Sequence, residues 1–506
     1  MGLLTVLIAT LLAALIALLG YLKWIQNYWE RRAIPAAKNT HILTGNMAGM
    51  GTKISLAIAL QKIYREFRER RLAFGGFNNF FAPTILAVDP EFVKLVLVKE
   101  FNVFHDHGFY TDAESDPLNS HLFNLDGAKW RVMRQKLSPT FTSGKMKMMF
   151  NTVQSVADEL KKFVEENYHR EDLEIRDLLQ RFTTDVIGSV AFGIECNSFK
   201  DPDSKLREMA GKVFELSPKT LVKTFVGIQF KGLARWMKMK LTDDEVEKFF
   251  MELVRTTVES REKSDVQRND FMKLLLEIKN SGKLSDAPDS GGDGLTMNEL
   301  AAQCFVFFAA GFETSSTAMN FCLYELAINE EIQDRLREEI NDVLGENGGQ
   351  LTYDALMKMD YLDRVFNETL RKYPPLDNTF RTNSVDYTVP GTNYTIPAGT
   401  FVQIPMYALQ RDPEHFPAPE RFDPDRFLPE VVKTRHPYAY VPFGEGPRIC
   451  IGMRFGVMQA KIGLVTLLQN FKFRVNSRTP IPMEFEPASV TLSPKNGMYL
   501  QIERVK

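Results

Sequence analysis

The apolar positions of the chain follow three successive patterns. The sequence opens on an unbroken apolar run, Leu3 to Leu22. From about residue 127 to 280, apolar residues recur at the spacing of amphipathic helices. Between 387 and 404 the period shortens to two around Pro390-Gly391 and Pro397-Ala398-Gly399, which predicts short strands joined by tight turns. The expected fold is therefore mainly α-helical with small β-sheets.

One helix of the second half has a clear beginning. Thr296 and Glu299 form a capping box directly ahead of a long apolar stretch. This predicts a buried helix from Met297 to about Asn329, because a helix that is apolar on all sides belongs in a core. The same signals of period, proline and glycine predict loops at 281–294 and 408–449 and helices at 361–373 and 451–470.

The opening apolar run predicts a membrane anchor. Its twenty residues carry no charge, and as a helix they span about 30 Å, the thickness of bilayer hydrocarbon. Basic residues follow at Lys23, Arg31 and Arg32, which keeps that side in the cytosol. A cleaved signal peptide is the alternative, but no basic residue precedes the run. The predicted division is an anchor at 1–22, a tether at 23–50 and one folded body at 51–506.

Charge and cysteine content exclude several classes of protein. The net charge is -2, so no basic surface of the whole chain points to nucleic acid. The four cysteines form no C-x-x-C pair, which argues against a structural zinc site and against a disulfide framework. They are Cys196, Cys304, Cys322 and Cys450.

A glycine-rich loop surrounds the last of these cysteines. Gly444 and Gly446 permit a tight loop and a close approach of the backbone to a flat group. Cys450 stands where the last helix begins, and a helix N-terminus stabilises a thiolate. A lone thiolate without a second cysteine or a histidine nearby fits iron in a macrocycle better than zinc. A buried structural cysteine is the alternative.

The long apolar helix contains the segment Ala310-Gly311-Phe312-Glu313-Thr314. Its small residues allow a flat ring or dioxygen to approach the backbone. The Thr314 hydroxyl can bond the Ala310 carbonyl and bend the helix, and an acid beside an alcohol offers a path for protons. Taken alone, a helix with one buried polar pair is the simpler interpretation.

Three further pairings are common when taken singly. Glu368 and Arg371 share a helix face, as do Trp130 and Arg134. The segment Pro419-Glu420-Arg421-Phe422 follows about fifty residues after the first pair.

Together these motifs resemble one family. The pattern F-G-x-G-x-R-x-C-x-G at 443–452 resembles the haem-binding loop of cytochrome P450 enzymes at every defining position, and the other motifs occur in that family's order. With the segments 137–145 and 307–314, the chain is most similar to the insect microsomal family 6. The resemblance implies the cytochrome P450 fold and haem b with an axial thiolate, bound by a monooxygenase domain at 51–506.

The resemblance also implies a role for each motif residue. Cys450 would bind the iron axially, with Phe443 packed near the sulfur. Thr314 would hold dioxygen, and Glu313 would help relay protons for O–O cleavage. The haem propionates would be met by Trp130, Arg134, Arg381 and Arg448. A structural network of Glu368, Arg371 and Arg421 would hold the segment that delivers Cys450. His107 stands where relatives often have an arginine, so a propionate contact there is expected to be weaker or pH-sensitive.

The implied reaction inserts one oxygen atom from O2 into an apolar small molecule, such as an insecticide, a plant toxin, or an endogenous hormone or lipid. Electrons would come from NADPH through a flavoprotein reductase, with cytochrome b5 as a further partner, at the endoplasmic reticulum membrane. The alternatives are a haem isomerase or dehydratase that rearranges a peroxide, and a non-catalytic haem sensor. The intact Glu313-Thr314 pair argues against the isomerase, and substrate-dependent use of NADPH would exclude the sensor.

Two surfaces and a pocket complete the expectation. Residues 219–241 hold six basic residues, no acid and interleaved apolar residues, a composition that can lie on an anionic membrane. An ordinary helical cover is the alternative. A basic face for an acidic reductase is expected from Lys129, Arg131, Lys136 and Arg435. The pocket is expected near Phe109, Phe123, Phe305, Ala309, Leu376 and Val490.

Overall fold

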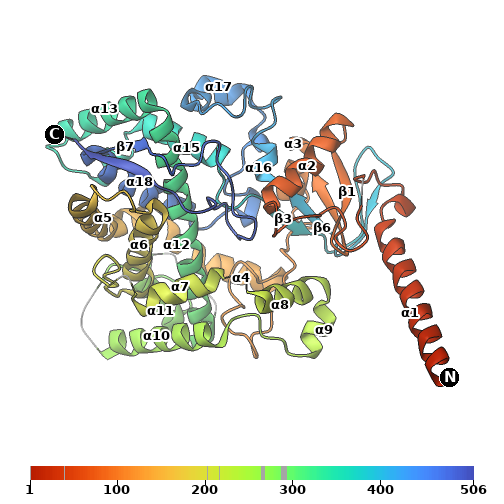
Figure 1. Cartoon of the computed structure of the whole chain (residues 1–506). Helices are drawn as coiled ribbons and strands as arrows, with labels where there is room; N and C mark the ends of the chain where they lie inside the picture. The colour runs from red at the N-terminus through yellow and green to blue at the C-terminus, as the bar shows by residue number, and fades with distance from the viewer. Residues whose placement is uncertain are drawn as a thin grey trace.

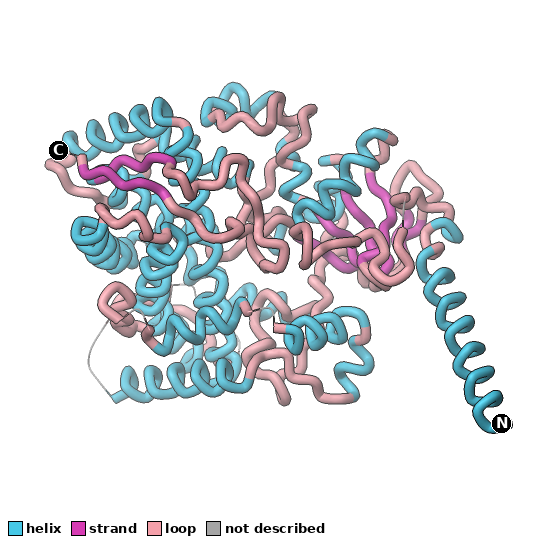
Figure 2. Tube along the Cα trace, in the orientation of Figure 1, coloured by secondary structure: helices cyan, strands magenta, loops and turns pink. Residues whose placement is uncertain are grey.

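Helices dominate the structure, and the strands gather toward its two ends (Figure 1, Figure 2). The structure is a computed structural model that describes residues 2–38, 40–201, 203–215, 217–263, 268–286 and 293–505. The expectation of a mainly α fold with small sheets is confirmed. Within the predicted loop at 281–294, residues 287–292 lie outside the described residues.

The helices are α1 (Gly2–Gln26), α2 (Leu56–Glu69), α3 (Pro90–Lys94), α4 (Gly127–Leu137), α5 (Ser143–Asn167), α6 (Ile175–Ile187), α7 (Lys205–Phe214), α8 (Pro218–Gln229), α9 (Lys231–Trp236), α10 (Asp244–Lys263), α11 (Phe271–Ser281), α12 (Met297–Ile328), α13 (Glu330–Glu346), α14 (Tyr353–Leu356), α15 (Asp360–Lys372), α16 (Met406–Leu409), α17 (Pro429–Thr434) and α18 (Met453–Asn470). The strands are β1 (Phe74–Asn79), β2 (Ala82–Ala87), β3 (Thr379–Thr382), β4 (Tyr387–Thr388), β5 (Thr395–Ile396), β6 (Phe401–Ile404), β7 (Phe471–Val475) and β8 (Leu500–Arg504).

The largest sheet has the strand order β1-β2-β6-β3. Its β2–β6 pair is parallel, whereas β1–β2 and β3–β6 are antiparallel. The predicted strands between 387 and 404 are present as β4, β5 and β6. Strand β3, Thr379–Thr382, was not predicted.

The core is divided between the helices and the sheet. One hydrophobic cluster joins α5, α6, α12, α15 and α18, and a second surrounds α2 and the main sheet. Helix α12 runs through the first cluster and packs against α6, α10, α15 and α18 (Figure 1). Its predicted capping box is confirmed: the Thr296 hydroxyl accepts a hydrogen bond from the Glu299 N–H at 3.2 Å, and the Glu299 carboxylate accepts one from the Thr296 N–H at 2.9 Å.

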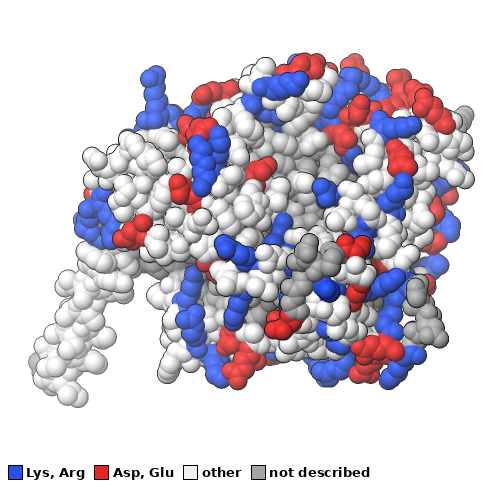
Figure 3. Space-filling view, turned by 180° about the vertical axis from the view of Figure 1, so that it is seen from behind, with Lys and Arg blue, Asp and Glu red and all other residues white. Residues whose placement is uncertain are grey.

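The predicted anchor forms one helix that projects from the body. Helix α1 continues to Gln26, its most apolar window has a mean hydropathy of 2.7, and none of that window is buried. The projecting part carries no charged side chain (Figure 3). By length and composition it is a candidate membrane span.

The segment that follows α1 is packed onto the edge of β1. The Trp29 indole, 1% exposed, donates a hydrogen bond to the Phe77 carbonyl at 3.1 Å. Its ring occupies the place of a side chain at Gly76, where a Cβ would lie 2.3 Å away. Ala36 forms a bridge with Gly76, and the Asn78 side chain bonds the Gln26 carbonyl at 2.9 Å. The segment that was expected to be a tether therefore packs against the main sheet as part of the folded body.

Candidate cofactor and active site

The loop before α18 is closed by its own backbone. The Cys450 N–H donates to the Phe443 carbonyl at 2.9 Å, and the half-buried Phe443 packs against the helical core. Gly444 and Gly446 adopt φ values of 70° and 74°, in the left-handed region. At Gly446 a Cβ would also lie 2.1 Å from the Leu97 carbonyl oxygen. Glycine is therefore required there for two independent reasons, and the loop holds Cys450 two residues ahead of the Gly452 N-cap.

The surroundings of Cys450 act on its thiol in opposing directions. Burial has the largest effect and raises its pKa, while a hydrogen bond from the Gly452 N–H and the positive charge of Arg134 act in the opposite direction and favour the thiolate. Its side chain is nevertheless exposed, as happens when a group faces a space inside a protein. Cys304 differs, because it is fully buried and the charge of Asp270 raises its pKa further.

Positive charge is concentrated beside this loop. Burial lowers the pKa of Arg381 to about 9 and that of Arg448 to about 10, and it also lowers the pKa of Arg134. Among the described residues, the Arg381 Nε has no hydrogen-bond partner although the side chain is buried. A buried donor without a partner and several destabilised cations fit an anionic group such as a carboxylate.

The N–H donors of Arg448 bind acceptors within the protein itself. Its guanidinium donates to the Leu125 carbonyl at 2.7 Å and lies 4.3 Å from the centroid of the Trp130 ring. It also pairs with Asp126 at 3.4 Å. Arg448 therefore fixes the segment that precedes α4, and Arg381 is better placed to meet an added carboxylate.

Glu313 and Thr314 are adjacent in α12 but contact different groups. The Thr314 hydroxyl donates to the Ala310 carbonyl at 2.7 Å, as expected. The Glu313 carboxylate is buried and accepts hydrogen bonds from three side chains. These are Arg176 at 2.6 Å, Gln180 at 2.9 Å and Thr491 at 3.0 Å. Direct contact of the acid with the Thr314 hydroxyl is thus not the arrangement observed. These partners lie far from Glu313 along the chain, so no local sequence pattern indicated them.

One stripe of α12 is open although the helix lies inside the body. Ala310 is exposed, and Val306 and Thr314, one turn away on either side, are half-buried. Three of the expected pocket residues are exposed apolar side chains: Phe123 at 42%, Leu376 at 38% and Val490 at 49%. The loops that hold Leu376 and Val490 meet through a hydrogen bond between the Leu492 N–H and the Pro375 carbonyl at 3.0 Å.

The remaining expected pocket residues differ in burial. The Phe109 ring packs 5.8 Å from that of Phe123, so the structure brings these two together. Ala309 is half-buried on α12, and Phe305 is buried against Phe250 at 5.2 Å.

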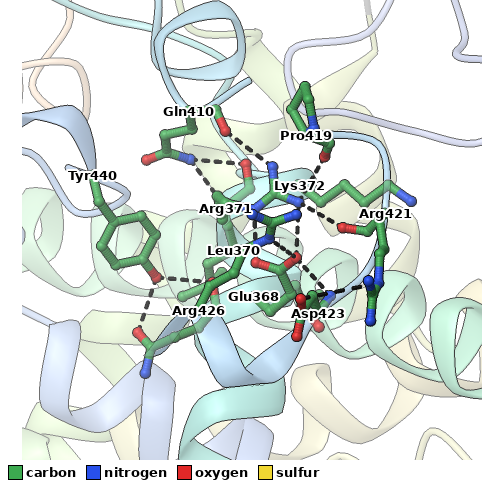
Figure 4. Close-up of polar contacts among 12 residues, drawn as sticks. Glu368, Leu370, Arg371, Lys372, Gln410, Pro419, Arg421, Asp423, Arg426 and Tyr440 are labelled. Atoms are coloured by element: carbon green, nitrogen blue, oxygen red, sulfur yellow. Dashed lines mark hydrogen bonds and ion pairs between the residues drawn. The ribbon is translucent and has the colours of Figure 1, made fainter. Parts of the chain in front are cut away.

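Glu368 and Arg371 form a fully buried ion pair (Figure 4). The guanidinium donates to both carboxylate oxygens, at 2.6 and 2.8 Å. Arg371 also donates to the Gln410 carbonyl at 3.0 Å and the Pro419 carbonyl at 2.8 Å, and the Asp423 N–H donates to Glu368 at 2.9 Å. The pair therefore holds the irregular segment that leads to Cys450, as expected.

The third member of this network is Arg426, and the prediction of Arg421 is wrong in this respect. The Arg421 side chain is 74% exposed and lies 4.0 Å from Asp423, while its carbonyl oxygen is 3.5 Å from Arg371. The Arg426 guanidinium, 11% exposed, lies 3.4 Å from the Glu368 carboxylate (Figure 4). The chain contains two similar tetrapeptides, Pro419-Glu420-Arg421-Phe422 and Pro424-Asp425-Arg426-Phe427. Spacing alone did not distinguish them.

The expected basic face is smaller than predicted. Lys129 and Arg131 are exposed on α4. Lys136 is buried and bonds the Asp293 carbonyl, and the Arg435 guanidinium is stacked 4.5 Å from the Phe416 ring. Lys136 is therefore directed into the interior, and Arg435 is half-buried against an aromatic ring.

The basic segment 219–241 forms α8 and α9. Phe225 faces inward, since its ring packs against Phe80 at 6.3 Å and Phe81 at 6.1 Å. Several apolar side chains of this segment are exposed, namely Leu221, Val222, Phe230, Leu233, Trp236 and Met237.

An exposed thiol ahead of a helix, a buried cluster of arginines and an open stripe on a central helix fit a haem-thiolate protein. The family model for cytochrome P450 matches residues 35–501. Cytochrome P450 6a2 of Drosophila melanogaster is 45% identical, covering 98% of this chain and 99% of its own length. Cytochrome P450 6A1 of Musca domestica is 44% identical, covering 96% of each chain. The chain belongs to the cytochrome P450 family, whose members are monooxygenases that bind haem through a cysteine thiolate.

Proposed function

We propose that Cys450 is the axial ligand of the haem iron and that the chain inserts one oxygen atom from O2 into apolar small molecules. The observation that supports this most strongly is the setting of Cys450, whose side chain is exposed and lies where the Gly452 N–H and the charge of Arg134 oppose the effect of burial on its pKa. When bound, the haem supplies the activation of dioxygen, and the thiolate donates electron density that favours O–O cleavage.

The proposed substrate class rests on the apolar side chains expected to line the pocket. Phe123, Leu376 and Val490 are exposed apolar side chains, which suits xenobiotics such as insecticides or plant toxins and equally endogenous hormones or lipids. The test is reconstitution with an NADPH-dependent flavoprotein reductase. A monooxygenase consumes NADPH and forms oxygenated product in response to substrate. A product formed from an added peroxide without NADPH would indicate an isomerase instead.

Thr314 is expected to control how efficiently electrons are used. Its hydroxyl lies on the open stripe and can accept and pass a proton, whereas valine keeps the shape and removes that ability. Thr314→Val should lower product formed per NADPH about 100-fold, at the low end of general acid–base contributions, while NADPH oxidation continues.

Ser316→Ala is the matched control, because Ser316 makes the same kind of bond to the Phe312 carbonyl, at 3.0 Å, and is fully buried. Unchanged coupling in Thr314→Val would remove the assignment. Glu313→Gln should also reduce coupling if the acid participates in proton delivery.

The reductase, and cytochrome b5 as a further donor, are proposed to dock on the face formed by Lys129 and Arg131 of α4. Lys129→Glu with Arg131→Glu should slow the first electron transfer by about 10-fold at low salt, since charge steering accelerates association by at least that factor. Raising the salt concentration should shrink the difference. Stopped-flow reduction under carbon monoxide measures it. The same reversal at the exposed Lys62 and Arg65 of α2 should have little effect, and equal slowing in both variants would contradict the docking site.

We further propose that α1 spans the endoplasmic reticulum membrane with the body in the cytosol. The guanidinium groups of Arg31 and Arg32 lie over the rings of Trp24, at 4.3 Å, and Tyr28, at 3.8 Å. Aromatic and basic residues together are typical of a cytosolic membrane interface. The exposed apolar side chains of α8 and α9 offer a second contact with lipid.

A further inference from the structure

A buried histidine lies between the two most strongly perturbed arginines. His107 is 5% exposed. Its Nδ1 lies 2.8 Å from the Phe123 carbonyl oxygen, and its Nε2 lies 3.1 Å from the Arg381 Nη1. A carbonyl only accepts, so the shorter contact to Phe123 assigns the proton to Nδ1, and a guanidinium only donates, so Nε2 is the acceptor toward Arg381. The Arg448 Nη1 lies farther from Nδ1, at 3.3 Å, and in this tautomer it finds no acceptor there.

The ring is held in this orientation from several sides. It packs 4.4 Å from the Phe123 ring and 5.5 Å from the Phe380 ring. The His107 N–H donates to Asp126 at 3.1 Å, which fixes the backbone. The imidazole cannot rotate to exchange its donor and acceptor without breaking the contacts to both Phe123 and Arg381.

The charges around His107 keep it neutral. Burial is the largest cause that lowers its pKa well below the usual value, followed by the charges of Arg381 and Arg448. The acids on the same segment, Asp106 and Asp126, pair with Arg448 at 3.6 and 3.4 Å. Lys231 of α9 adds another cation near these acids.

We propose that His107 is a positioning residue for Arg381: its Nε2 accepts one guanidinium N–H and thereby holds the unpartnered Arg381 Nε–H in place for a haem carboxylate. This inference rests on the proposed haem site. In this arrangement a neutral imidazole orients a cation, so the cluster of arginines gains no further positive charge. A glutamine can reproduce both contacts, because its amide donates to Phe123 and its oxygen accepts from Arg381. A leucine can reproduce neither.

The experiment compares full-length haem-loaded wild type, His107→Gln and His107→Leu, with His105→Gln as the control. His105 is a half-buried neighbour whose side chain bonds the Asn102 carbonyl. Haem transfer to apomyoglobin is followed from pH 5 to pH 8, and the haem reduction potential is measured by spectroelectrochemistry. At pH 7.5 His107→Leu should lose haem about 10-fold faster, as expected when buried partners are left unpaired, and its potential should become more negative. His107→Gln should remain close to wild type in both.

The pH dependence below about pH 6.5 distinguishes a positioning role of His107 from simple packing. A histidine whose pKa is lowered by folding contributes stability that is present above its ordinary pKa, about 6.5, and lost as the pH falls below it. The urea midpoint of wild type and of His105→Gln, measured from pH 5 to pH 8, should therefore fall progressively below that pH, and His107→Gln should show a smaller fall. The same pH dependence below about pH 6.5 in wild type and His107→Gln, or an unchanged haem reduction potential in His107→Leu, would overturn the proposal. Failure of the wild type itself to form a thiolate-ligated haem would instead overturn the proposed function.

Discussion

Replacing Cys450 by serine should abolish the strongly red-shifted Soret band that the reduced wild type shows with carbon monoxide. A serine hydroxyl stays protonated at neutral pH even beside Arg134, so it cannot supply the anionic ligand that shifts the band. Substitution of residues outside the ligand set already costs 10- to 100-fold in metal affinity or activity. Loss of the ligand should therefore reduce oxygenation by more than about 100-fold.

Cys196→Ser is the matched control for this experiment. Cys196 is half-buried, and both burial and the negative charge of Asp185 raise the pKa of its thiol, whereas at Cys450 the Gly452 N–H and Arg134 oppose the effect of burial. The control should keep both the band and the activity. A wild-type band typical of histidine ligation, or a Cys450→Ser protein that retains the red-shifted band, would contradict the assignment of the ligand.

Removing Glu368 should prevent the protein from retaining haem. In Glu368→Ala the Arg371 guanidinium remains charged and 0% exposed, and breaking a buried pair from one side costs about 3–5 kcal/mol. That is a large share of the stability of a typical domain. Because the pair holds the segment leading to Cys450, haem content and the urea midpoint should fall together. Both are measured on the purified protein by absorbance and by circular dichroism.

A comparison of two nearby arginines tests the corrected network. Arg426→Ala removes a cation 3.4 Å from the buried Glu368 carboxylate and its hydrogen bond to the Ala418 carbonyl at 2.9 Å, and it should cost about 1.5–3 kcal/mol, the range for hydrogen bonds to charged groups. Arg421→Ala truncates a side chain that is 74% exposed and should stay within about 0.5 kcal/mol of wild type. The reverse order of effects would restore Arg421 as the third member.

Features defined by local sequence were predicted well. The capping box at Thr296, the glycines around Cys450 and the short strands after Tyr387 depend on neighbouring residues, and they are present as expected. The end of α15 at Lys372 also follows from the two prolines beyond it.

Features that depend on distant contacts could not be predicted. Glu313 is bound by Arg176, 137 positions before it, and by Thr491, 178 positions after it. The directions of long side chains are equally non-local: Lys136 belongs to a charged stretch in the sequence, yet it turns inward to the Asp293 carbonyl. Such side chains are placed by the packing of whole elements.

The joint formed by Trp29 has a mechanical consequence. The Trp29 indole fills the space above Gly76, and the Asn78 side chain donates a hydrogen bond to the last residue of α1. These contacts join the helix to the sheet and restrict its rotation relative to the body. In a bilayer, a helix longer than the hydrocarbon thickness tilts to match it. Any tilt of α1 would therefore rotate the whole folded body with it. The thickness of the host membrane would then help to set the angle between the body and the membrane surface.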